Sequence, residues 1–179
     1  IHEQCRGRCN IMTALGDAFP IPVLGLNKYL WHSMCQIDTT LPTQYDGITP
    51  FFPLADSRGG DAPWDDKPYI VYDNMFKMRP GSFPHIHRVQ AMYFVRGSAK
   101  DVVVWTNAIS QILDRGDSAA QDANNYLASS DPGHYFHRFK VFQIDMVSDQ
   151  RQDLAVRQYY TASMIVEVDY HITNMLGFD

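Results

Sequence analysis

The sequence predicts a single α+β domain in which an antiparallel sheet carries helices packed on one face. Apolar residues repeat at three- and four-residue steps in one segment near the start of the chain and in two near its middle, as in amphipathic helices. Segments rich in aromatic and β-branched residues lie between and after these helices. The chain has 179 residues, the length of one domain with one well-buried core.

The composition argues against several classes of function. A net charge of −5 disfavours general affinity for DNA or for an anionic membrane surface. No run approaches the roughly 20 apolar residues of a membrane-spanning helix, and no signal peptide is recognisable, so we expect a soluble intracellular protein. Cys5, Cys9 and Cys35 predict reduced thiols and no disulfide framework. Cys5 and Cys9 could form half of a metal site, but no second cysteine pair completes it.

The first predicted helix spans residues 23–37 and opens a domain that we expect to cover residues 23–175. Prolines at positions 20 and 22 cannot continue a helix backwards, so residues 1–22 are predicted to be an N-terminal arm. Residues 176–179 form a short C-terminal tail. The apolar stripe of the helix consists of Val23, Leu26, Leu30, Met34 and Ile37.

A long ordered loop is predicted at residues 39–67, which are rich in proline and glycine and show no sustained apolar period. Loops longer than about 12–15 residues are uncommon in compact domains and tend to be functional. The acids Asp65 and Asp66 within it are interpreted as solvated loop residues.

Two strands are predicted next, at residues 69–76 and 85–96, joined by a turn at Arg79, Pro80 and Gly81. Apolar residues occupy both faces of the second strand, which indicates a strand covered on two sides. The two strands are therefore expected to form a hairpin.

Two helices follow. Asp101 is the predicted N-cap of the first helix and Gly116 its end. Asp117 is predicted to cap the second helix, which runs to about Ser129 before the breaker sequence at residues 131–133. The stripe of the first helix is Val102, Trp105, Ile109, Ile112 and Leu113, and the thinner seam of the second is Ala120, Ala123 and Leu127.

The last two predicted strands span residues 135–147 and 163–172. In the first, the apolar parity switches near Val141, which predicts a β-bulge. In the second, alternation places Glu167, Asp169 and His171 on a polar face. The opposite, apolar face consists of Met164, Val166, Val168, Tyr170 and Ile172.

His85 and His87 are the best metal-ligand candidates, because alternate residues of a strand share a face. A third ligand would come from His134, His137 or Asp73, but we favour surface histidines beside turns for all four histidines. No hydrolase, phosphate-binding, zinc-protease or Cys-x-x-Cys motif is present, so we expect no catalytic residue, cofactor or metal and no enzyme activity.

Residues 148–160 are polar and contain neither glycine nor proline, which predicts an extended hairpin reaching beyond the sheet. Protruding strands expose edges that neighbouring copies can cover. We therefore expect this hairpin, the N-terminal arm and the long loop to contact other subunits. The predicted interface residues of the hairpin are Arg151, Asp153, Leu154, Val156 and Arg157.

The layout resembles that of the tail terminator proteins of tailed bacteriophages, also called tail completion or sheath-stabilising proteins. The resemblance is carried by residues 67–72, 90–95, the helix 101–113, and the strands around 135–147 and 163–172. It implies a hexameric ring in the virion, assembled in the host cytoplasm, that caps the tail tube and, in contractile tails, the sheath.

The resemblance implies several partners for such a ring. They are the tail tube protein, the sheath protein and the neck or connector proteins, with no membrane involved. DNA would pass through the lumen without specific binding, which an acidic lumen favours. The alternatives are another ring-forming neck, adaptor or tube-like virion protein, or a small metalloenzyme that uses His85 and His87.

Overall fold

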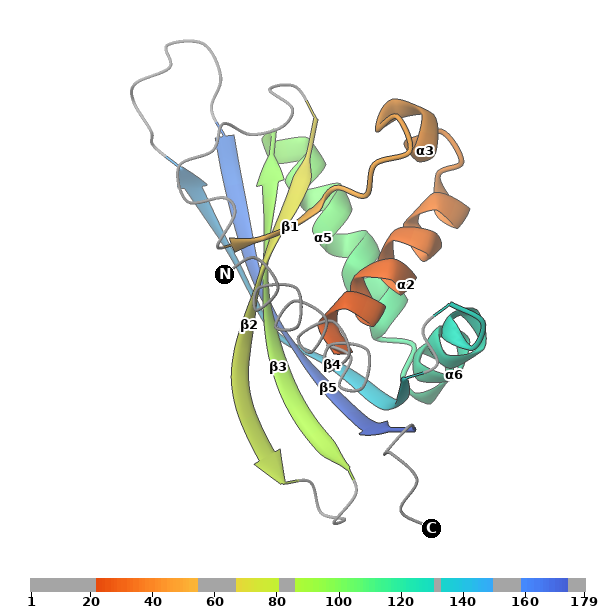
Figure 1. Ribbon diagram of the computed structural model, residues 1–179. Coiled ribbons are helices and arrows are strands. Elements are labelled where there is room, and N and C mark those ends of the chain that lie inside the picture. Colours follow the sequence, from red (N-terminus) through yellow and green to blue (C-terminus); the bar gives the residue numbers. More distant parts are fainter. Residues whose placement is uncertain (1–21, 55–66, 81–85, 131–132, 150–158, 174–179) are drawn as a thin grey trace, which may run out of the picture.

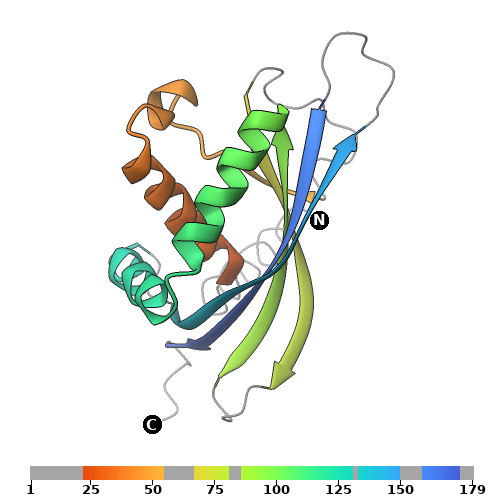
Figure 2. The same ribbon diagram turned by 180° about the vertical axis from the view of Figure 1, so that it is seen from behind.

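The computed structural model describes residues 22–54, 67–80, 86–130, 133–149 and 159–173, and shows two layers, a twisted sheet and a layer of helices (Figures 1 and 2). The helices all lie against one face of the sheet, as predicted. The helices are α2 (Pro22–Ile37), α3 (Leu41–Gln44), α5 (Ala99–Leu113) and α6 (Asp117–Leu127). The strands are β1 (Phe51–Pro53), β2 (Tyr69–Pro80), β3 (His87–Gly97), β4 (His134–Asp149) and β5 (Tyr159–Ile172).

The five strands have the order β1-β2-β3-β5-β4, and the sheet is mixed. β1 runs parallel to β2, whereas the other neighbouring pairs are antiparallel. The prediction of a purely antiparallel sheet is therefore wrong at this edge. The loop predicted at residues 39–67 is also wrong in part, because it contains α3 and β1. β1 is short and ends in Pro53, which is tolerated at a sheet edge.

The core lies between the helix layer and the sheet. Apolar side chains of both layers are buried there. Each fully buried Leu, Ile or Phe contributes about 1.5–3 kcal/mol to the stability of the fold, relative to the same side chain exposed to water. The predicted stripe of α2 is buried except for Ile37, which is 66% exposed at the end of the helix. The largest fully buried side chains include Leu26, Tyr29, Leu30, Ile70, Tyr93, Ile109, Leu113, Phe136 and Met164.

The N-terminus of α5 differs from the prediction, because Ser98 and not Asp101 is the N-cap. Ser98 has extended backbone angles, and its Oγ accepts a 3.2 Å hydrogen bond from the Asp101 amide. The Ser98 hydroxyl in turn donates to Asp101 Oδ2 at 2.5 Å. Asp101 thus lies three residues inside the cap, where a carboxylate also favours the positive end of the helix. The predicted apolar stripe is buried throughout.

Helix α6 begins after Gly116, which is its N-cap, so Asp117 lies in the first turn and does not cap the helix. Gly116 has a φ of 66°, a backbone conformation that glycine adopts readily. The helix ends at Leu127, earlier than the predicted Ser129. Its seam of Ala120, Ala123 and Leu127 is buried as predicted and packs against β4.

Strands β2 and β3 form the predicted antiparallel pair. β2 continues through Pro80, into the turn predicted at residues 79–81, and β3 begins at His87. Along β3, Val89, Ala91, Tyr93 and Val95 are buried towards the helices, and the alternate residues are half-buried on the other face.

Strands β4 and β5 pair from His134 opposite Ile172 to Asp149 opposite Tyr159. The predicted bulge is confirmed as a register shift between Val141 and Gln143. A second shift, between Phe136 and Arg138, was not predicted. On β5 the predicted apolar face is buried except for Ile172, which is half-buried.

Several predictions concern residues that the structure does not describe. These are the N-terminal arm up to residue 21 with Cys5 and Cys9, the segment 55–66 with Asp65 and Asp66, His85, residues 150–158 of the proposed hairpin, and the tail at 176–179. Cys35 is described and is a half-buried free thiol. No helix within the described ranges is long and apolar enough to cross a membrane.

Candidate functional site on the open face of the sheet

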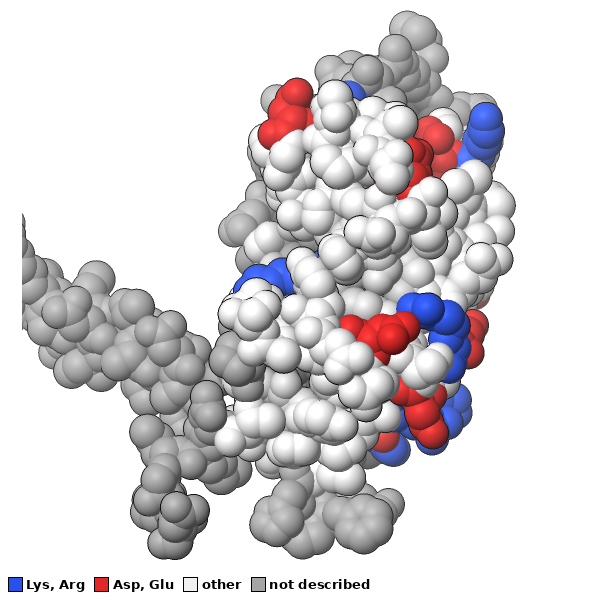
Figure 3. All heavy atoms as spheres, turned by 90° about the vertical axis from the view of Figure 1, so that its right-hand side faces the viewer, with Lys and Arg blue, Asp and Glu red and all other residues white. Residues whose placement is uncertain are grey.

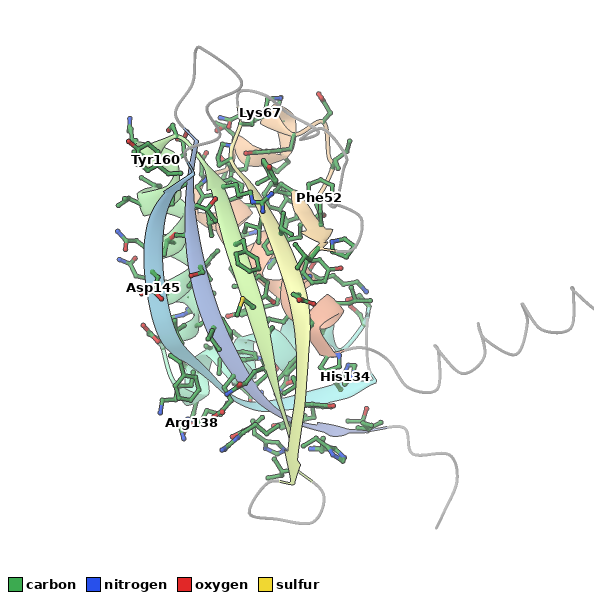
Figure 4. All side chains as sticks on the ribbon, turned by 90° about the vertical axis from the view of Figure 1, so that its left-hand side faces the viewer. Phe52, Lys67, His134, Arg138, Asp145 and Tyr160 are labelled. Carbon is green, nitrogen blue, oxygen red and sulfur yellow. The ribbon has the colours of Figure 1, made fainter. Side chains whose placement is uncertain are left out.

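The face of the sheet opposite the helices forms the candidate site, which we call the open face (Figure 4). Along β3 and β5 every second side chain points to this face and is half-buried, while the residues between them are buried towards the helices. The open-face residues are Arg88, Gln90, Met92, Phe94 and Arg96 on β3, and Thr161, Ser163, Ile165, Glu167, Asp169 and His171 on β5. The face therefore has an apolar part and a polar part.

Arg88 is the centre of the polar part. Its Nε and Nη2 donate to the two carboxylate oxygens of Asp169 at 2.6 and 2.8 Å, across the β3–β5 pair. Its Nε also lies 3.3 Å from Glu167 Oε1, and Gln90 donates to Glu167 Oε2 at 3.4 Å. The hydrogen bonds with Asp169, followed by the charges of Asp169 and Glu167, raise the pKa of Arg88. Bidentate guanidinium–carboxylate pairing of this kind fixes the geometry of both side chains.

The two histidines His137 and His171 lie beside this network. His137 is the residue inserted by the unpredicted bulge, and His171 is on β5. His137 Nε2 and His171 Nδ1 are 2.8 Å apart, a hydrogen-bond distance. The ring of Tyr135 lies 5.1 Å from the His171 ring and 5.3 Å from the His137 ring.

Strand β4 forms one edge of the sheet, marked in Figure 4 by Arg138 and Asp145. It carries two large apolar side chains that face solvent, Phe142 at 47% and Ile144 at 46% exposure. Both lie at or just after the confirmed bulge. The Lys140 ammonium is 4.5 Å from the centre of the Phe142 ring, a cation–π distance. The edge therefore combines apolar surface with a cation.

The predicted metal ligands are divided between the two faces of the sheet. His87 lies opposite Tyr170, and His134 also contacts Tyr170, with ring centres 5.6 and 5.4 Å from it. Asp73 is opposite Met92 on the open face, where His137 also lies. His87 therefore cannot share an ion with Asp73 or His137. Within the described part of the chain, no group of three His, Cys, Asp or Glu side chains is arranged to hold a metal ion.

His134 corrects another expectation. The sequence predicts an exposed histidine at the start of a strand, but this side chain is only 6% exposed and stacks on Phe136. Helix α6 packs against β4, and its Asn124 side chain hydrogen-bonds the backbone of Phe136, the residue on which His134 stacks. The predicted exposure of His137 is partly right, since its side chain is half-buried.

The sequence-predicted interface residues, Arg151, Asp153, Leu154, Val156 and Arg157, lie outside the described residues. The exposure of Phe142 and Ile144 was not predicted. Phe142 is the extra residue of the bulge, whereas Ile144 lies opposite Met164 on the helix side of the sheet. Both are nearly half exposed because β4 is an edge strand of the described sheet.

A pocket of about 450 Å³ lies on the opposite side of the molecule, among α2, α5 and α6. Arg115 at its wall donates to the Tyr29 hydroxyl at 3.0 Å and pairs with Asp122 at 3.2 Å. The ring of His32 stacks on Tyr126 at 4.0 Å. Because Asp122 balances the charge of Arg115, the pocket favours no anionic ligand. Figure 3 shows charged atoms of both signs scattered over this side of the molecule.

The fold and the open face define a two-layer α+β domain with an exposed apolar edge strand. No protein-family model matches the chain, and a search of curated proteins finds no significant match. Its function has therefore to be inferred from its own surface and from the organisation of its elements.

Proposed function

We propose that this chain is a structural subunit that assembles with copies of itself into a closed ring, and that the ring caps the tail tube of a tailed bacteriophage. The observation that carries this proposal is the edge strand β4, where Phe142 and Ile144 are each nearly half exposed. Exposed apolar side chains beside a strand edge are typical of surfaces that another chain covers.

The open face supplies a second, adjoining surface for such a contact. Met92, Phe94 and Ile165 are half-buried there, so part of their apolar area remains available for burial by a partner. The charges of Arg88 and Asp169 are already satisfied within the subunit. A partner can cover this part of the face without burying an unpaired ion, which would be costly.

A ring forms when the β4 edge of one subunit contacts a different patch of the next subunit, because an edge that pairs with its own copy gives only a dimer. A contact between different patches of identical subunits either closes into a ring or grows into an open filament. Closure satisfies every edge and limits the size of the particle. The expected hexamer, and the expected contacts with the tail tube, sheath and neck proteins, come from the resemblance to tail terminator proteins.

The resemblance is supported by the elements that carry it, since helix α5 and strands β2 to β5 all form in the predicted order. The net charge of −5 suits a ring through which DNA passes, because like charge prevents adhesion. A neck, adaptor or tube-like ring protein would use the same edge. The position of the ring along the particle distinguishes these alternatives.

The test is electron microscopy of phage particles in which this protein carries a gold-binding peptide tag. Label at the head-proximal end of the tail tube is expected for a tail terminator. Label at the head vertex would favour an adaptor, and label along the whole tail would favour a tube protein. Absence of label from intact particles would contradict the proposal.

A further inference from the structure

The bulge between Phe136 and Arg138 has a chemical consequence on the open face. Tyr135 lies opposite His171, and strand alternation places His137 on the same face as Tyr135. The bulge leaves His137 without a paired residue on β5, and across the β4–β5 pair His137 Nε2 and His171 Nδ1 are 2.8 Å apart. Bulges are frequent beside functional sites.

The distance between the two nitrogens fits a shared metal ion. Imidazole nitrogens bind divalent transition metals at about 2.0–2.1 Å, so two of them at a right angle around one ion are about 3 Å apart. A tetrahedral ion would hold them at about 3.4 Å. The observed 2.8 Å lies nearer to the right-angle arrangement, which octahedral or square-planar Ni²⁺ and Cu²⁺ adopt.

The surroundings hold both rings in place and leave them accessible. Tyr135 stacks on the His171 ring with planes 26° apart, and it also contacts the edge of the His137 ring. Both histidines are half-buried and β4 is an edge strand, so an ion can approach from solvent. Asp169 is already held by Arg88, so it does not compete for the imidazoles.

We propose that His137 and His171 form a two-histidine chelate site for a divalent transition metal, with water in the remaining coordination positions. Binding requires a lone pair on both facing nitrogens. The proton of the present hydrogen bond would therefore move, through solvent, to the other nitrogen of the same ring. The expected order of affinity is Cu²⁺, then Ni²⁺, then Zn²⁺. The proposal does not rest on the ring assembly, and the site lies towards the start of β4, ahead of Phe142 and Ile144.

The test is calorimetric titration of the full chain with NiCl₂ and ZnCl₂ in a non-coordinating buffer. Wild type should bind Ni²⁺ more tightly than Zn²⁺. His137→Ala and His171→Ala should each weaken Ni²⁺ binding roughly 100-fold, because loss of one ligand removes the intramolecular second contact. His32→Ala, at the stacked histidine of the helix layer, is the matched control and should bind as wild type.

A second measurement does not depend on the variants folding. In wild-type protein labelled with ¹⁵N, stoichiometric Zn²⁺ should shift the ring resonances of His137 and His171 and leave that of His32 unchanged. Ni²⁺ binding by both alanine variants at wild-type affinity would overturn the proposal, since other histidines or cysteines would then hold the ion. Ring resonances of His137 and His171 that do not respond to Zn²⁺ would overturn it equally.

Discussion

The Tyr93 hydroxyl on β3 donates a 2.8 Å hydrogen bond to Asn27 Oδ1 on α2, inside the core. Tyr93 is fully buried and Asn27 is 5% exposed, so the bond joins the two layers of the fold out of contact with water. Burial, with a smaller contribution from Tyr72, raises the pKa of Tyr93 well above its ordinary value. The phenol therefore stays protonated and remains a donor throughout the physiological pH range.

Tyr93→Phe should lower the free energy of unfolding by about 1–3 kcal/mol, because it leaves Asn27 Oδ1 buried without this donor. The measurement is the urea midpoint at constant m-value. The double variant Asn27→Leu/Tyr93→Phe removes both polar groups and should lose less than the sum of the two single variants. An unchanged midpoint for Tyr93→Phe would mean that the bond adds nothing to the packing of α2 on the sheet.

Gly97→Ala should destabilise the protein by about 1–3 kcal/mol, the usual cost of overpacking. A Cβ atom at position 97 would lie 3.1 Å from Pro68 Cβ and 3.2 Å from Pro68 Cα, and the proline ring cannot rotate away. Thermal unfolding measures the effect. The control is Gly47→Ala, where a Cβ meets no atom within 4 Å. Because φ at Gly47 is +73°, this control measures the cost of a left-handed backbone without overpacking. Gly97→Ala with a wild-type melting temperature would show that Pro68, just before β2, shifts without cost to make room for the new Cβ.

The Arg88–Asp169 pair should contribute a modest, salt-dependent coupling. A double-mutant cycle of Arg88→Met and Asp169→Asn is expected to give about 1 kcal/mol, since the Arg88 side chain is 35% exposed and solvent screens the pair. The coupling should fall in 1 M NaCl. A coupling near zero at low salt would contradict the account of the open face as a surface with internally satisfied charges.

The sequence predicted the elements whose apolar residues repeat clearly. Helices α2, α5 and α6 and strand β5 were found from periodicity, and the bulge near Val141 from a change of parity. β1 was missed because it has only three residues, and the prolines at 50 and 53 mark the segment as a loop. Its place in the sheet depends on parallel pairing with β2, which local sequence does not encode.

The functional surface was harder to predict for physical reasons. His137 and His171 are 34 residues apart, and their contact depends on the pairing register of β4 and β5, which local sequence does not encode. Ser98 was overlooked as the N-cap because Asp101, an equally good capping residue, stands three positions later. Phe142 and Ile144 resemble core residues in the sequence, and only their place on the edge strand shows that they face solvent.

The central claim is that copies of this chain assemble through the β4 edge, and sedimentation velocity of the full chain tests it most directly. Wild type should sediment as one closed oligomer, expected to be a hexamer. Phe142→Glu/Ile144→Glu should sediment as a folded monomer, because charge at the edge prevents its burial. Val104→Glu, at an apolar residue 54% exposed on α5, is the matched control and should leave the oligomer intact. Wild type that remains monomeric at its highest soluble concentration, or an oligomer unaffected by the double substitution, would contradict the account.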